Sequence, residues 1–208
     1  MGKAEENKRF KRNNLLTKSY DLFTTKGITD TSISDIVNSA GVAKGTFYFY
    51  FKDKQDIIDH LIARKSEGIL INAVNYLNDR KKADPDISTV DMIIAVADSM
   101  VTDLSKDPKL VRFLNRNLNL GFYQKFVTDD TLITTINVHE EYEEILHSNG
   151  AKWKDEMIML YTLIEFISST AHTIILEGRP CDLDTYKPYM FECIRKICDV
   201  FALEQDET

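Results

Sequence analysis

The sequence lacks the long hydrophobic runs that mark membrane and secreted proteins. Its longest apolar run, residues 92–97, is far shorter than the ~20 residues needed to cross a bilayer. The first twenty residues are polar and contain no apolar segment of a secretory signal. The three cysteines are odd in number and form no CxxC pair, which favours small hydrophobes in a reduced compartment over a disulfide or metal site. These absences predict a cytoplasmic protein.

Catalytic and cofactor motifs are also missing. The sequence contains no GxSxG, P-loop or dinucleotide-binding pattern. The stretch HEEYEE at 139–144 has Glu143 where a HExxH zinc motif needs its second histidine, so it is better interpreted as a solvated acidic face. The four histidines are widely scattered. We therefore expect no catalytic residues, no metal site and no cofactor.

The charge is unevenly distributed along the chain. The net charge is -7, yet residues 1–54 carry ten lysines and arginines against six aspartates and glutamates. Residues 55–208 carry sixteen basic against twenty-seven acidic residues. A basic N-terminal part on an acidic remainder suggests a polyanionic partner for the N-terminal part alone.

The periodicity of apolar residues predicts an all-α fold. Prolines and most glycines lie where the 3.6-residue period breaks, and no alternating strand pattern is bounded by hairpin turns. About nine helices are expected, with an N-terminal three-helix head joined to a larger helical-bundle body. Their approximate ranges are 8–25, 33–39, 44–50, 54–79, 88–105, 108–124, 129–148, 153–178 and 184–204.

Residues 32–51 have the pattern of a helix-turn-helix. Ser32 is the expected N-cap of the helix 33–39, with Asp35 in a capping-box position. Gly41 can adopt the left-handed conformation that ends this helix before the helix 44–50 begins. Phe47 and Phe51, four residues apart, should point into the core. The outer face is then left with Lys44, Gly45, Thr46, Tyr48, Phe49 and Tyr50.

The stretch from residue 22 to 57 resembles the DNA-binding head of the TetR family of transcriptional repressors. The residues that carry the resemblance follow the family spacing without a gap: Leu22-Phe23, Lys26-Gly27, Thr31-Ser32, Asp35-Ile36, Ala40-Gly41-Val42, Lys44-Gly45-Thr46, Tyr48, Tyr50-Phe51 and Lys54. The resemblance implies a DNA-binding domain at 1–54 and a ligand-binding and dimerisation domain at 55–208.

The resemblance also assigns roles in DNA binding. It implies that Lys44, Gly45, Thr46 and Phe49 lie near base edges, and that Thr31, Ser32, Tyr48, Tyr50 and Lys54 hold phosphates. Two positions depart from the family pattern. Ala43 stands where the family often has Ser or Thr, so the helix 44–50 lacks a side-chain N-cap. Phe49 replaces a frequent His or Tyr; its ring would either meet thymine methyl groups or pack on its own domain.

The helix expected at 153–178 is apolar around most of its circumference, as in a helix that is fully buried or forms an interface. The resemblance implies that it and the helix 184–204 form a four-helix bundle with a second copy of the chain. A two-fold homodimer would bind a palindromic operator. A monomeric protein with a buried core helix is the alternative.

The resemblance finally implies a small-molecule pocket among the middle helices. Candidate lining residues are polar or aromatic groups in apolar helical stretches: Phe113, Asn117, Tyr123, Tyr142, Tyr161, Glu165 and His172. Our hypothesis is a dimeric repressor that a small effector releases from DNA. The alternatives are a DNA-binding protein that acts constitutively or through a protein partner, and an all-α enzyme or ligand carrier.

Overall fold

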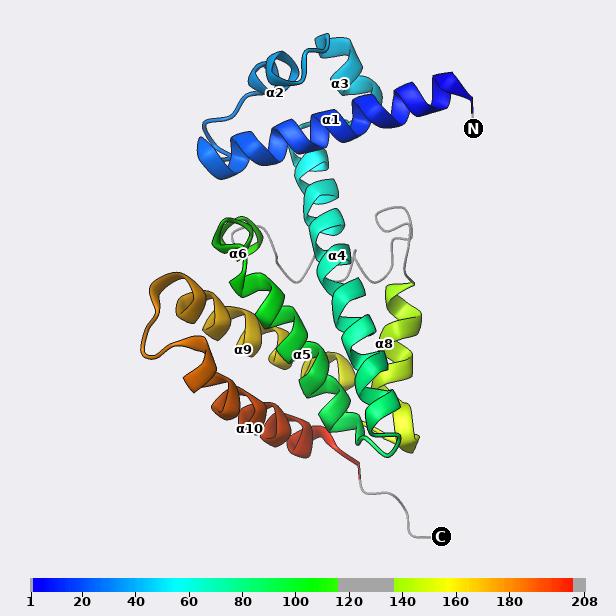
Figure 1. Cartoon of the computed structure of the whole chain (residues 1–208), viewed down its shortest axis with the longest axis vertical. Helices are drawn as coiled ribbons and strands as arrows, with labels where there is room; N and C mark the ends of the chain where they lie inside the picture. Colours follow the sequence, from blue (N-terminus) through cyan, green and yellow to red (C-terminus); the bar gives the residue numbers. More distant parts are fainter. Residues whose placement is uncertain (1, 116–136, 204–208) are drawn as a thin grey trace. The chain divides into compact units, whose positions relative to one another are not determined.

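A computed structural model of the chain describes residues 2–115 and 137–203, and these contain nine α-helices (Figure 1). The all-α prediction is confirmed; within the described residues the only β-type pairing is an isolated bridge between Trp153 and Ala202. The helices are α1 Lys3–Thr25, α2 Ile33–Ala40, α3 Lys44–Tyr50, α4 Lys54–Ala83, α5 Thr89–Ser105, α6 Pro108–Asn115, α8 Val138–Leu146, α9 Glu156–Glu177 and α10 Leu183–Phe201, with a 3-10 turn, η1, at Ser148–Gly150.

The contacts divide the chain into two compact units, an N-terminal unit ending at Lys65 and a C-terminal unit beginning at Ser66. The division falls inside α4, whereas the sequence places it at the start of this helix. The reason is that the first turns of α4 belong to the N-terminal core, where Ile57, Ile58 and Leu61 are buried. The assignment of DNA binding to one part and ligand binding to the other remains a prediction.

The N-terminal unit consists of α1, α2, α3 and the beginning of α4. In it α1 packs against α2, and α2 against α3 (Figure 1). Leu15 and Leu16 of α1 are fully buried, as are Phe47 of α3 and Phe51 just after it. The position of α3 is therefore set by a conventional apolar core, which leaves its opposite face in solvent.

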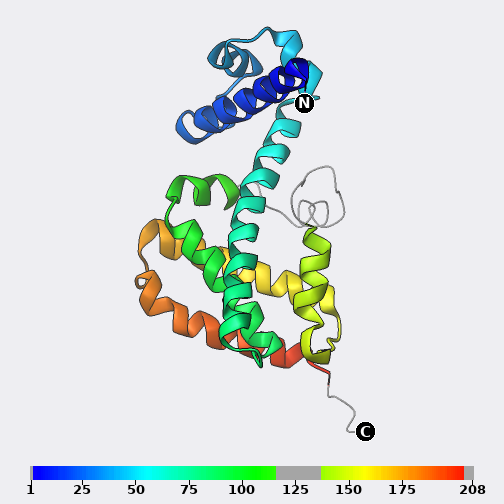
Figure 2. The same cartoon turned by 45° about the vertical axis from the view of Figure 1, so that its right-hand side comes forward.

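In the C-terminal unit, α9 packs against α6 and α10, and α10 also contacts α5 (Figure 2). The core includes Val101, Met159, Leu163, Met190 and Ile194. Cys198 is also buried there, which raises the pKa of its thiol to about 11. The other two cysteines are free as well, Cys181 partly buried and Cys193 exposed.

Helix α9 is apolar on more sides than the described part of the C-terminal unit covers. In the described part of the chain it is the one helix long and apolar enough to cross a membrane, with a mean hydropathy of 1.4, but only 22% of that window is buried. Ile158 and Tyr161 are exposed on it. The apolar surface predicted from the sequence is thus present, and the described part of the chain leaves it uncovered.

Candidate DNA-binding surface

The turn between α2 and α3 has the geometry that the sequence predicts. Ser32 Oγ accepts a hydrogen bond from the Asp35 N–H at 3.1 Å, and Asp35 Oδ2 accepts one from the Ser32 N–H at 2.8 Å, which completes the capping box. Gly41 has φ of 65°, a left-handed conformation that suits glycine. Ala43 caps α3 without a side-chain hydrogen bond, as its methyl group requires.

The five consecutive aromatic residues of α3 and its C-cap separate by face. Phe47 and Phe51 are buried, with ring centroids 5.7 Å apart. Tyr48 is 51% exposed and Phe49 is 68% exposed, while Tyr50 is half-buried. The Phe49 ring meets Tyr50 edge to face at 4.9 Å, and most of its surface remains open. Packing on its own domain therefore does not account for Phe49.

The polar residues of α3 differ in exposure. Lys44 and Gly45 at its first turn are exposed, and Thr46 is half-buried. A Cβ built on Gly45 would meet no other atom within 4 Å, so neither steric crowding nor left-handed geometry explains glycine there. Together the outer face of α3 offers an ammonium, hydroxyls, open backbone and an apolar ring. The ammonium and the hydroxyls suit phosphates or base edges, open backbone allows close approach to DNA, and the apolar ring suits a methyl group.

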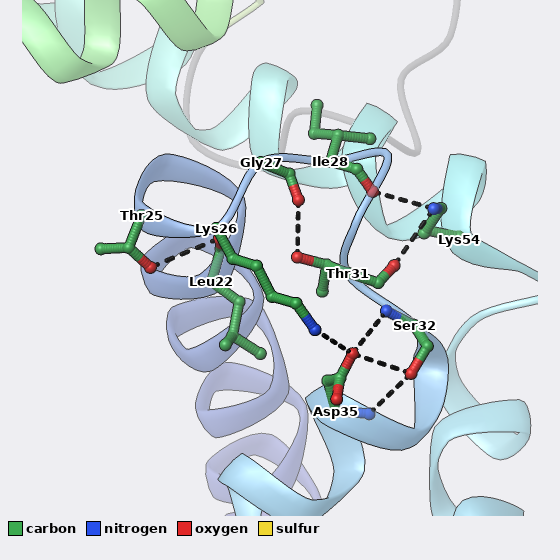
Figure 3. A network of polar contacts seen from close by, with 9 residues as sticks. All are labelled: Leu22, Thr25, Lys26, Gly27, Ile28, Thr31, Ser32, Asp35 and Lys54. Carbon is green, nitrogen blue, oxygen red and sulfur yellow. Dashed lines mark hydrogen bonds and ion pairs between the residues drawn. The ribbon is translucent and has the colours of Figure 1, made fainter.

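A polar network joins the loop between α1 and α2 to the beginning of α4 (Figure 3). Lys54 Nζ donates hydrogen bonds to the carbonyl oxygens of Ile28 at 2.9 Å and Thr31 at 3.1 Å. The Thr31 hydroxyl donates to the Gly27 carbonyl at 2.6 Å, and Thr31 is buried. Both side chains thus hold the loop, which differs from the phosphate contacts that the resemblance implies. Lys54 keeps a third N–H for another acceptor, whereas the Thr31 hydroxyl has already donated its only proton.

Asp35 is the second centre of this network. Its Oδ2 atom accepts from the Ser32 N–H and hydroxyl and lies 2.9 Å from Lys26 Nζ (Figure 3). The Ser32 N–H above all, followed by the Lys26 ammonium, lowers the pKa of Asp35 to about 2. The sequence predicts the capping box but not the ion pair between Lys26 and Asp35, because a partner nine residues away across a loop leaves no periodic signal.

The residues expected to line a ligand pocket lie in different environments. Phe113 is buried, His172 is half-buried, and Tyr161 and Glu165 are exposed on α9. The hydroxyl of the half-buried Tyr142 donates to Glu156 Oε1 at 2.5 Å. Asn117 and Tyr123 lie outside the described residues.

Two hollows of the C-terminal unit involve other residues. A groove of about 450 Å³ between α9 and α10 is lined by Phe166, Glu192, Cys193, Lys196 and Ile197. A second hollow of about 730 Å³ is lined by Lys81, Pro85, Met92, Glu143, Glu144, His147, Ser148 and Asn149. Neither hollow is lined by any of the five described pocket candidates. Their role in ligand binding stays a prediction.

Comparison with known proteins agrees with this architecture. Residues 15–61 match the family model of bacterial regulatory proteins of the tetR family. The HTH-type transcriptional regulator YvdT of Bacillus subtilis is 33% identical over 189 residues, covering 88% of this chain and 92% of that protein. The relatives and structural neighbours are transcriptional regulators, not enzymes.

Two solved structures extend the likeness to the whole fold. A tetR family transcription regulator from Shewanella sp. PV-4 superposes with a TM-score of 0.67 at 11% identity, covering 93% of this chain and 99% of that one. The regulator FadR from Bacillus subtilis, solved in complex with stearoyl-CoA, superposes with a TM-score of 0.56 at 19% identity, covering 87% and 96%. The chain belongs to the TetR family of DNA-binding transcriptional regulators.

Proposed function

We propose that this protein is a homodimeric repressor that binds a palindromic operator through α3 and is released by a small effector bound in the C-terminal unit. The observation that carries the proposal is the outer face of α3, where Lys44, Tyr48 and Phe49 are exposed beside a buried Phe47. A short helix anchored on one side and exposing donors and an apolar ring on the other suits the major groove.

The contacts can be divided by chemistry. Lys44, Gly45, Thr46 and Phe49 are proposed to lie near base edges, because they occupy the first two turns of α3. The hydroxyls of Tyr48 and Tyr50 are proposed to hold phosphates directly, and that of Ser32 only on release from its hydrogen bond to Asp35. Lys54 is assigned mainly to holding the loop, with one donor available to a phosphate. The buried Thr31 side chain is left out of the proposed contacts.

A second copy of the chain is the proposed occupant of the apolar surface of α9 and α10. Ile158 and Tyr161 on α9 are exposed, as are Tyr189 and Val200 on α10. The groove between the two helices is lined partly by apolar side chains, among them Phe166. Large apolar surfaces on soluble proteins mark interaction sites, and symmetric dimers are the commonest oligomers. A two-fold axis would in turn explain a palindromic operator.

Effector control is proposed on the C-terminal unit. The stearoyl-CoA complex of the FadR neighbour supports a ligand site in this fold. Helix α4 contributes residues to both units, so it can couple them. An effector could weaken operator binding only by the amount that it prefers the conformation unable to bind DNA. A regulator without an effector would show no such coupling.

The test begins by selecting bound fragments from the source genome and measuring affinity for the recovered operator at several salt concentrations. We expect affinity to fall steeply with salt, because phosphate contacts release counterions. Combining Lys44→Ala with Tyr48→Ala should lower operator affinity by at least about tenfold and flatten the salt dependence.

The matched control is Lys82→Ala, which removes one positive charge from the C-terminal unit at the end of α4. It should leave affinity within about twofold. Unchanged operator affinity in the Lys44/Tyr48 double variant would show that α3 does not recognise the operator. Titrating the operator complex with candidate small molecules then distinguishes an effector-controlled repressor from a constitutive one.

A further inference from the structure

Three potential metal ligands converge where α8 meets α9. Glu143 lies on α8 and His147 is its C-cap, four residues later, while Glu156 begins α9. Their ligand atoms all lie within 4.8 Å of one another. The 3-10 turn and the left-handed residues Asn149 and Asp155 between the two helices bring Glu156 back to the end of α8.

The spacing of these atoms differs from that of ordinary hydrogen-bonded ion pairs. His147 Nε2 lies 3.4 Å from Glu143 Oε2 and 3.3 Å from Glu156 Oε2. A charge-assisted N–H···O hydrogen bond is about 2.7–2.9 Å long. Two ligands each ~2.0–2.1 Å from a tetrahedral zinc ion stand roughly 3.3 Å apart. The imidazole and both carboxylates are therefore placed like ligands around a common centre.

Neighbouring groups orient two of the three side chains. His147 Nδ1 lies 3.5 Å from the Ala151 carbonyl oxygen, longer than a normal hydrogen bond; with the proton on Nδ1, the Nε2 lone pair is available on the side of the carboxylates. The Tyr142 hydroxyl donates to Glu156 Oε1 at 2.5 Å, which leaves Oε2 toward His147. Such contacts to the distal atom of a ligand are typical of metal sites.

The local charge balance also favours a cation. Glu143 and Glu156 share one imidazole, and within the described residues no lysine or arginine forms an ion pair with either. The adjacent Glu144, by contrast, has its own partner in Lys81 at 2.8 Å. Glu143 and His147 line the open hollow of about 730 Å³, so solvent can reach the centre and fill further coordination positions.

We propose that Glu143, His147 and Glu156 form a binding site for a divalent first-row transition metal ion such as Zn²⁺. One imidazole nitrogen and two carboxylate oxygens suit such ions, whereas Mg²⁺ and Ca²⁺ prefer oxygen ligands alone. The bound ion tethers the end of α8 to the beginning of α9. This inference goes beyond DNA binding and does not depend on it.

Calorimetric titration of the full chain with Zn²⁺ tests the site. We expect one ion per chain and binding at least about 100-fold weaker in His147→Ala and Glu156→Gln, since even loss of an orienting contact costs 10–100-fold. Tyr142→Phe should weaken binding about tenfold by freeing Glu156. With Co²⁺ as the probe, the visible spectrum should show nitrogen and oxygen ligation without a thiolate charge-transfer band.

Two matched controls remove the same chemical groups elsewhere in the chain. His172→Ala deletes an imidazole from α9, and Glu144→Gln neutralises the neighbouring carboxylate that pairs with Lys81; both should retain wild-type affinity. Circular dichroism confirms that each variant is folded. The proposal is overturned if wild-type protein binds no Zn²⁺, if His147→Ala binds it unchanged, or if a Cys193→Ser variant abolishes binding instead.

Discussion

Phe49 presents an aromatic ring to solvent on a helix whose other outward residues are mostly polar. At 68% exposure it contributes little to the core, and Tyr50 covers only part of it. An exposed apolar ring on a DNA-binding helix has an evident use in contacting the methyl group of thymine. Its neighbour Phe47, fully buried two residues earlier, shows the contrast between a ring that stabilises the fold and one that is available to a partner.

Phe49→Ala should therefore separate DNA binding from stability. We expect the free energy of unfolding to change by less than about 0.5 kcal/mol, as for most exposed positions. Operator affinity should fall by about tenfold, measured by fluorescence anisotropy. Phe47→Ala is the opposite control and should destabilise the protein by about 3–5 kcal/mol. Equal operator affinity of Phe49→Ala and wild type would assign the ring no role in recognition.

Asp35 makes the stability of the N-terminal unit sensitive to acid. Its pKa of about 2 in the folded chain lies below the unfolded value near 3.9. The stabilisation is therefore complete above about pH 4 and is lost as pH falls from about 4 to about 2. Urea unfolding of the full chain, followed by circular dichroism, should show Asp35→Asn less stable than wild type at pH 6. This difference should shrink steadily as pH falls toward 2; a difference that stays constant would mean that Asp35 does not contribute through its charge.

At the scale of elements, the sequence predicts helices well where an apolar face and a cap coincide. Helix α2 is within one residue of the expected range because Ser32 and Gly41 mark its two ends chemically. Helix α3 has the expected range although Ala43 offers no side-chain cap. The start of α1 at Lys3 was missed by five residues because its first turns, although rich in helix-forming residues and carrying Glu5 and Glu6, have no apolar face.

Contacts distant in sequence account for several other differences. Helix α9 begins at Glu156, not 153, because the Trp153 indole donates to the Leu146 carbonyl at 2.7 Å and the Lys154 N–H donates to Phe201. The loop contacts of Lys54 span 26 and 23 residues, and no periodicity reports them. The Glu143–His147 spacing is visible in the sequence, but the turn that returns Glu156 to them is not.

Substitution of Gly45 tests whether the backbone of α3 approaches DNA closely. It lies inside a seven-residue helix, with open space where a Cβ would be. Gly45→Ala should raise the free energy of unfolding by up to about 1 kcal/mol, since alanine is the better helix former. Operator affinity should fall nonetheless, because the added methyl group keeps the backbone away from DNA. If Gly45→Ala is more stable and binds the operator as tightly as wild type does, close approach of the backbone to DNA at this position is excluded.

At the scale of the whole molecule, the exposed face of α9 predicts self-association. Placing a carboxylate in the proposed interface, as in Tyr161→Glu, would bury an unpaired charge. Sedimentation velocity should show a dimer for wild type and self-association at least about 100-fold weaker for the variant. Because Tyr161 is already 44% exposed, the fold should be retained.

Tyr76→Glu is the matched control for the interface. It makes the same substitution at an exposed tyrosine of α4 and should remain dimeric. Operator affinity should fall in Tyr161→Glu alone. A dimeric Tyr161→Glu protein would place the subunit contact elsewhere.

The uncovered apolar surface of α9 also bears on how the regulator responds to its own abundance. If the operator-binding species assembles through this surface, its concentration rises with the square of monomer concentration whenever the dimer is the minor form. Operator occupancy then changes more steeply than protein level. Dimerisation through this apolar face would set a threshold protein concentration for occupying the operator. That threshold depends on the dimerisation constant and not on DNA affinity alone.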